Sequence, residues 1–244
     1  MHRLCRFYSS TLGKKAVVAV TGVILFGFVI GHMMGNLKTF MGVNTVGVPK
    51  IDIYAQFLRT MGEPLFGYAE ILWVVRGILL VALVLHIVSV IHLVRQNKAA
   101  RPQAYVKHRR VESSLAARWM MVTGLLLFAF IVMHILHLTT GTIDFGRFVD
   151  GKVYANLYYS FQHWYVALIY VVAMALLMLH LRHGAWSLFQ TLGFDNPDRN
   201  RGLRYFATGA ALLLFIGFSA VPTAIYVGAL PSPTHVTLNM GEGS

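Results

Sequence analysis

Charged residues are scarce in this chain of 244 residues: Asp, Glu, Lys and Arg together make up 12% of it, about half the share found in ordinary soluble domains. Hydrophobic residues make up 57%, which excludes intrinsic disorder and disfavours a soluble domain. Acidic residues are the scarcer charge, nine against 21 lysines and arginines, for a net charge of +12. In a chain this apolar, a basic excess indicates a membrane protein oriented by its cations and not a nucleic-acid-binding protein.

Cysteine is nearly absent, because Cys5 is the only one in the chain. This excludes a disulfide framework, a thiolate metal cluster and a CxxCH site for covalent haem. Pairs of acidic residues within the apolar runs are also missing, which weakens the hypothesis of a pump or transporter. The chain has no phosphate-binding loop, dinucleotide fingerprint or GxSxG motif. Histidine, in contrast, occurs 11 times, mostly within apolar runs.

Five apolar windows are long enough to cross a bilayer, which takes about 20 predominantly apolar residues. The windows are Ala16–Leu37, Leu65–Val94, Arg118–Thr140, Phe161–Leu181 and Tyr205–Val227. The segments between them are too short to build a second core, and no internal repeat stands out. We therefore predict an all-α integral membrane protein with five transmembrane helices in a single membrane domain, residues 1–244.

Lysines and arginines are divided unevenly between the two sides of these windows. Fifteen lie before the first window, between the second and third, and after the fourth, whereas five lie on the opposite side. The positive-inside rule then places the N-terminus in the cytoplasm and the C-terminus outside. We call the cytoplasmic side inner and the exterior side outer.

Each of the first four windows contains one histidine that stands out: His32, His86, His134 and His180. Polar side chains inside a bilayer are costly, so their default interpretation is functional. At a rise of about 1.5 Å per residue, His32 and His134 lie about 24 Å from the inner ends of their helices. His86 and His180 lie about 12 Å from theirs, if the fourth helix continues to about Leu188. The spacing predicts an outer pair, His32 with His134, and an inner pair, His86 with His180.

Two histidines from opposite helices can ligate a haem iron on both faces and leave no position open for oxygen or a substrate. Such a haem transfers electrons. We therefore predict that the first four helices form a haem-binding four-helix bundle. The alternative is that these histidines form hydrogen bonds between helices, as they would in a haem-free transporter or a structural anchor.

Other residues near the two pairs have weaker signals. His183, one turn beyond His180, is the alternative inner ligand. Arg76 lies within the second window and is a candidate partner for haem propionates, with an interface arginine as the alternative. Histidines expected at the interfaces or beside the ligands are His92, His137 and His163. A row of small residues beside His32 could admit a neighbouring helix or a flat macrocycle: Gly27, Gly31 and Gly35.

The segments around these histidines resemble the cytochrome b membrane anchor of succinate:quinone oxidoreductases. The similar form is the five-span, two-haem anchor of bacteria, which is close to the anchor of menaquinol:fumarate reductase. The segments that carry the resemblance are, in chain order, SSTLGKKAVVAVTG, GHMMGN, LHIVSV, NKAARPQAY, ARWMMVTGLLLFAFIVMHILH, LHLRHGAWSLFQTLG and SAVPTAIY. Single segments are weakly diagnostic, but their order and gaps are specific and cover most of the chain.

The resemblance implies two haem b groups. His32 and His134 would hold the iron of the outer haem, and His86 and His180 that of the inner haem. Some relatives have His-Gly where this chain has Arg182-His183-Gly184, so His183 stays open as the inner ligand. His180 is favoured because related LH-x-x-(N/H)-G segments place the ligand first.

The resemblance also implies the function of an electron-transfer subunit of succinate dehydrogenase, respiratory complex II of the tricarboxylic acid cycle. The chain itself would hold no catalytic residue. A flavoprotein subunit would oxidise succinate, an iron–sulfur subunit would pass electrons to the inner haem, and a membrane quinone, menaquinone by resemblance, would take them near the outer haem. The expected location is the inner (plasma) membrane of a bacterium.

Glu70, near the outer end of the second window, is the candidate proton-active group at the quinone. Relatives that move protons through an acid in the fourth span place a glutamate near the ligand there. This chain has Met178 and Leu179 instead, so the resemblance does not extend to that pathway.

Two alternatives to this function stay open at the level of sequence. The same complex could run as a fumarate reductase, because direction depends on haem potentials and on the quinone. The chain could also anchor another dehydrogenase, such as formate dehydrogenase or hydrogenase, although the usual four-span layout of those anchors fits five windows poorly.

Overall fold

The computed structural model of the chain describes residues 7–100, 115–145, 148–194 and 196–233. Within these residues the regular structure is helical, with no β-strand. The elements are α2 (Thr11–Asn36), the 3-10 helix η1 (Leu37–Met41), α3 (Lys50–Thr60), α4 (Glu70–Ala99), α5 (Leu115–Leu138), α6 (Val153–Phe161), α7 (Trp164–Thr191) and α8 (Pro197–Tyr226). Five of them, α2, α4, α5, α7 and α8, are long and apolar enough to cross a membrane, which confirms the predicted all-α class and its five spans.

The long helices differ from the predicted windows mainly at their ends. Helix α4 begins at Glu70 and not at Leu65, because Ala69 has a left-handed backbone with a φ of 62°. Helix α7 runs on to Thr191, past the end of its apolar window. The predicted depth of His180 requires this extension. Helix α8 begins in polar sequence, where Pro197 occupies the first turn and the Asn196 side chain accepts a hydrogen bond from the helix.

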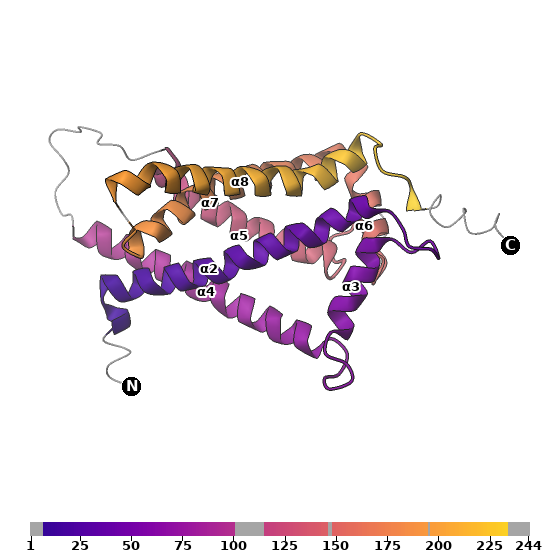
Figure 1. The fold of residues 1–244 in the computed structure, drawn as a ribbon, viewed down its shortest axis with the longest axis horizontal. Coiled ribbons are helices and arrows are strands. Elements are labelled where there is room, and N and C mark those ends of the chain that lie inside the picture. The colour runs from indigo at the N-terminus through magenta and orange to yellow at the C-terminus, as the bar shows by residue number, and fades with distance from the viewer. Residues whose placement is uncertain (1–6, 101–114, 146–147, 195, 234–244) are drawn as a thin grey trace.

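The long helices run alternately between two ends of the molecule, so that the start of α2 and the end of α8 lie at opposite ends (Figure 1). We keep the name inner end for the end where α2 begins, and outer end for the end where it stops. Helix α2 packs against α4, and α5 against α7, while α8 packs along α7 and also contacts α2. The four helices that carry the paired histidines therefore form two antiparallel helix pairs, α2–α4 and α5–α7.

Large apolar side chains cover the surfaces of the long helices. Trp73 of α4, Leu125 of α5 and Ile216 of α8 are each more than 60% exposed. Many other large apolar side chains on these helices are also exposed. Soluble monomers rarely expose apolar surface on this scale, whereas helices that satisfy their own backbone hydrogen bonds are stable in lipid. The fold therefore fits a lipid bilayer as its surroundings.

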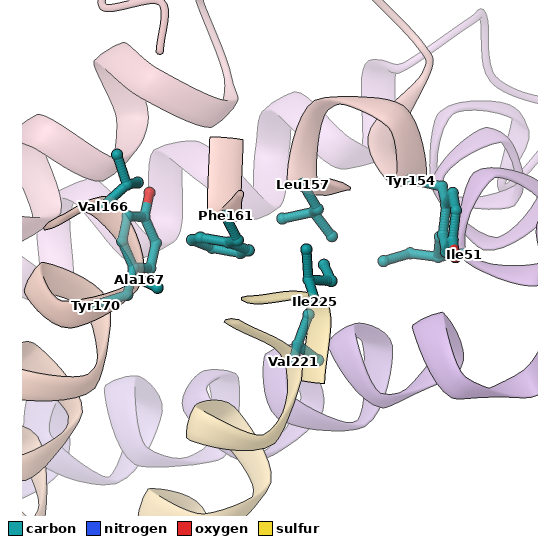
Figure 2. Close-up of a cluster of buried hydrophobic side chains, with 9 residues drawn as sticks. All are labelled: Ile51, Tyr154, Leu157, Phe161, Val166, Ala167, Tyr170, Val221 and Ile225. Carbon is teal, nitrogen blue, oxygen red and sulfur yellow. The ribbon is translucent and has the colours of Figure 1, made fainter. Parts of the chain in front are cut away.

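Two short helices that hydropathy did not predict, α3 and α6, lie at the outer end (Figure 1). They pack with α7 and α8 around one buried cluster (Figure 2). Its residues are Ile51, Tyr154, Leu157, Phe161, Val166, Ala167, Tyr170, Val221 and Ile225. In Figure 2, Leu157 of α6 points toward Ile225 of α8. The cluster fixes the outer half of α7, which carries Tyr170.

Asp52 of α3 provides the N-terminal cap that α6 does not supply for itself. The carboxylate Oδ1 of Asp52 accepts a hydrogen bond of 2.8 Å from the backbone N–H of Tyr154, whereas the Lys152 side chain makes no capping bond. Burial raises the pKa of the Asp52 carboxyl, and the hydrogen bond from Tyr154 opposes that shift. Asp52 thus joins the two short helices across about one hundred residues of sequence.

We expect Asp52→Ala to lower the free energy of unfolding by about 1 kcal/mol, because capping acceptors contribute on this scale. The measurement is denaturant unfolding of the protein in detergent micelles. Asp52→Asn retains an oxygen acceptor and serves as the control. Equal losses in the two variants would contradict a capping role for this side chain.

Candidate functional site

The two predicted outer ligands face each other. The ring centroids of His32 on α2 and His134 on α5 lie 5.8 Å apart, and the ring planes meet at 82°. Each imidazole also stacks on a phenylalanine one turn earlier in its own helix: Phe28 under His32 at 5.3 Å, and Phe130 under His134 at 5.8 Å. The fold therefore brings together two histidines that are about one hundred residues apart in sequence.

Tyr170 of α7 connects this pair to a third histidine. The Tyr170 hydroxyl lies 3.3 Å from Nδ1 of His134 and 2.8 Å from Nδ1 of His137. The other ring nitrogen of His137, Nε2, lies 2.8 Å from the hydroxyl of Ser160 on α6. Because both of its nitrogens are hydrogen-bonded and its side chain is 2% exposed, His137 is a structural group. Of these two histidines on α5, His134 is the one with a nitrogen left for a ligand.

The two predicted inner ligands are each held by a threonine from a neighbouring helix. Nδ1 of His86 on α4 lies 3.1 Å from the hydroxyl of Thr21 on α2. Nδ1 of His180 on α7 lies 3.3 Å from the hydroxyl of Thr123 on α5. These two hydrogen bonds each link helices within one pair, α4 to α2 and α7 to α5.

These hydrogen bonds suit histidines that bind a metal. A ligating imidazole coordinates through one ring nitrogen, and its other ring nitrogen donates to the protein, which fixes the tautomer and the ring orientation. Nδ1 is engaged in His86, His134 and His180, so Nε2 is the nitrogen left to coordinate. The donor set fits two haem irons, each with two axial imidazoles.

The contacts favour His180 over His183 as the inner residue on α7. The Thr123 hydroxyl lies 3.3 Å from Nδ1 of His180. Within the part of the chain that the structure describes, no hydrogen-bond partner is found for the His183 ring. His183 therefore lacks an anchoring hydrogen bond like the one that Thr123 makes with His180.

The glycines beside His32 divide into two kinds. A methyl group added at Gly27 or Gly31 would meet no atom within 4 Å. At Gly35, the third in the row, the added carbon would lie 2.7 Å from the Tyr54 ring of α3. Gly35 therefore serves helix packing, whereas Gly27 and Gly31 leave the surface of α2 next to His32 open.

The remaining predicted site residues have contacts of other kinds. The Arg76 guanidinium lies 4.8 Å from the centre of the Trp73 ring on the same helix. Glu70 is the first residue of α4 and is exposed at the outer end. Nδ1 of His92 lies 3.4 Å from the Tyr8 hydroxyl near the inner end, and His163 is exposed before α7. None of these contacts includes a paired histidine, so the propionate and quinone assignments stay predictions.

An apolar groove borders the inner histidine site. It has a volume of about 650 Å³ and is lined mainly by residues of α2 and α4, with Thr21 in its wall. Its volume falls within the range of small-molecule sites in proteins, about 300–1,000 Å³. An apolar ligand could therefore approach the inner site along this groove.

Comparison with protein-family models, with curated proteins and with solved structures finds no match for this chain. Thr21, Thr123 and Tyr170 were not predicted as site residues from the sequence. For the two threonines a signal was available, because each is followed by glycine and precedes an outer histidine by 11 residues. For Tyr170 no such signal exists, since its role depends on where α6 and α7 place it.

Proposed function

We propose that this chain is a dihaem cytochrome b that anchors a succinate:quinone oxidoreductase in the membrane. It carries electrons between the iron–sulfur subunit and a quinone. The observation that carries the proposal is the facing outer pair, His32 and His134, together with two inner histidines that are each held through Nδ1 by a threonine. Each pair takes one histidine from α2–α4 and one from α5–α7, at two separate depths.

The residues fit the group that they would hold. His32 and His134 would hold the outer haem b, and His86 and His180 the inner haem b. When bound, these haems would supply reversible one-electron chemistry, and the two histidines of each pair would occupy the positions that oxygen or a substrate would need. The protein contributes the ligands, their orientation through Nδ1, and apolar surroundings that exclude water.

The proposed partners of the chain and its proposed location rest on the family resemblance and on the charge pattern. The flavoprotein and iron–sulfur subunits of succinate dehydrogenase would dock at the inner end, the side to which the sequence pattern assigns most lysines and arginines. Menaquinone would react near the outer haem, with Glu70 as the proton-active group. The N-terminus would lie in the cytoplasm of a bacterium and the C-terminus outside its plasma membrane.

The experiment that tests this function is substrate reduction of the complex purified from native membranes through a tag on this chain. Succinate is expected to reduce at least part of its b-type haem, as seen in a reduced-minus-oxidised spectrum. Reduction by formate or hydrogen, but not by succinate, would assign the chain to another dehydrogenase. Haem that only dithionite reduces would contradict the proposed partners and leave the haem sites intact.

Arg76→Leu is expected to lower the midpoint potential of the outer haem by roughly 60 mV, a tenfold change in a one-electron equilibrium. The reason is that removing a nearby positive charge favours the oxidised iron, which carries one more positive charge. Potentiometric titration of the purified complex measures this shift. Trp73→Leu removes the ring stacked on Arg76 but keeps the charge, and is the control. Unchanged potentials in Arg76→Leu would remove this residue from the haem site.

A further inference from the structure

Helices α2 and α5 carry the same functional residues at the same spacing. The segments TGVILFGFVIGH and TGLLLFAFIVMH align without a gap and end at His32 and His134. Each begins with Thr-Gly and has a phenylalanine one turn before its histidine. The sequence alone did not reveal this repeat, because most of its positions are common membrane residues. The contacts distinguish it, since they give matching roles to matching positions.

Matching residues of α2 and α5 contact histidines at the outer level and at the inner level. Phe28 and Phe130 stack on the outer histidines of their own helices. Thr21 and Thr123 hold the inner histidines of the partner helices in α2–α4 and α5–α7. The glycine after each threonine lies beside the imidazole edge, where an added β-carbon would be in ordinary van der Waals contact. A β-carbon there would lie 3.6 Å from Cε1 of His86 at Gly22, and 3.4 Å from Cε1 of His180 at Gly124.

The hydroxyl positions favour the threonines as acceptors in the bonds to the histidines. The Thr21 hydroxyl lies 2.7 Å from the carbonyl oxygen of Val17, and the Thr123 hydroxyl lies 3.0 Å from that of Trp119. A hydroxyl has one proton, and a carbonyl oxygen can only accept it. When the hydroxyl proton is donated within the helix, the histidine donates from Nδ1. The lone pair of each imidazole is then on Nε2.

Burial makes these two bonds hard to replace. Thr21 is 4% exposed and Thr123 is 3% exposed, so water cannot readily take over as acceptor. A buried Nδ1–H without a partner costs about 1–3 kcal/mol. The alternative tautomer, with its proton on Nε2, would keep the bond only if the threonine hydroxyl turned its proton from the helix carbonyl to Nδ1. Each threonine therefore favours one nitrogen of its histidine for coordination.

We propose that Thr21 and Thr123 are positioning residues for the inner haem. They hold His86 and His180 as Nδ1–H tautomers with Nε2 directed at the iron, although neither threonine contacts the haem. This inference rests on the proposed function. It also means that α2 and α5 each serve both haems, through their own histidine at the outer level and their threonine at the inner level.

Thr21→Val and Thr123→Val test this role, because valine keeps the shape and removes the acceptor. Both variants are expected to change the same haem, the inner one. Its midpoint potential should rise, because the lost bond made the ligand more electron-rich, and its low-spin electron paramagnetic resonance signal should shift. Inner haem retention should fall by about tenfold, the typical effect of losing an outer-shell partner. The outer haem should keep its potential and its signal.

Two controls separate this role from a general effect on helices. Thr21→Ser and Thr123→Ser keep a hydroxyl and should restore the signal of the inner haem. Thr208 of α8 makes the same bond to its own helix, 2.9 Å to the Arg204 carbonyl oxygen. No histidine accompanies that bond, so Thr208→Val should change neither haem. If a valine variant does not accumulate, Thr21→Ala and Thr123→Ala remove the acceptor without adding a methyl group to the site.

The outcomes separate this inference from the proposed function. Two haems in the parent protein that stay unchanged in both threonine variants would overturn the positioning role and leave the cytochrome function standing. If the two variants change different haems, His86 and His180 do not share one iron, and the inference is overturned. A parent protein without haem would overturn the proposed function itself.

Discussion

Replacing His86 with alanine is expected to remove the inner haem and leave the outer haem in place. The iron loses one of its two axial ligands, and alanine has no side chain to replace it. The outer ligands do not depend on this residue, because Thr21 and His32 mark the two levels on α2 and are 11 residues apart, about 16 Å along a helix. The haem content per chain should therefore fall by half, as measured by the pyridine haemochrome method.

His92→Ala is the matched control for this variant. His92 lies on the same helix, nearer the inner end, and its Nδ1 faces the Tyr8 hydroxyl, so its removal should spare both haems. His32→Ala is the reciprocal test and should remove the outer haem alone. A full complement of two low-spin haems in His86→Ala would contradict the assignment of this residue as a ligand.

His137→Leu is expected to keep both haems and to lower the free energy of unfolding by about 2–4 kcal/mol. The imidazole is buried, with both nitrogens hydrogen-bonded, to Tyr170 and to Ser160. Leucine has a similar volume but leaves these two hydroxyls without that partner, and each buried group that loses its bond costs about 1–3 kcal/mol. Denaturant unfolding in detergent measures the loss, and the haem content is determined on the same preparation.

His134→Leu is the matched comparison for His137→Leu. His134 lies one turn earlier on α5 and has one engaged nitrogen where His137 has two. It should lose the outer haem. The reverse pattern, with haem lost from His137→Leu and kept in His134→Leu, would exchange the roles of the two histidines.

The spans and the depths of the histidines could be predicted from sequence because both depend on simple regularities. A membrane helix needs a long apolar window, and a regular helix advances by a constant rise. With charges to orient the helices, counting residues was enough to pair His32 with His134. The structure then places their ring centroids 5.8 Å apart.

Other features could not be predicted, because they depend on contacts between distant segments. Helices α3 and α6 are too short to give an apolar window, and α6 takes its cap from Asp52 on α3. The choice between His180 and His183 needed the neighbouring helix, where Thr123 holds one of them. The Thr-Gly spacing before each outer histidine marks Thr21 and Thr123 in the sequence, but the histidines that they hold lie on other helices and became visible only in the structure.

The most direct test of the central claim is the haem content of the purified protein, determined by the pyridine haemochrome method on an intact preparation. Two haem b groups per chain, both low-spin, are the expected result, because each of the two histidine pairs would hold one iron. An intact preparation without haem would contradict the account and would make the four histidines hydrogen-bonding groups between helices.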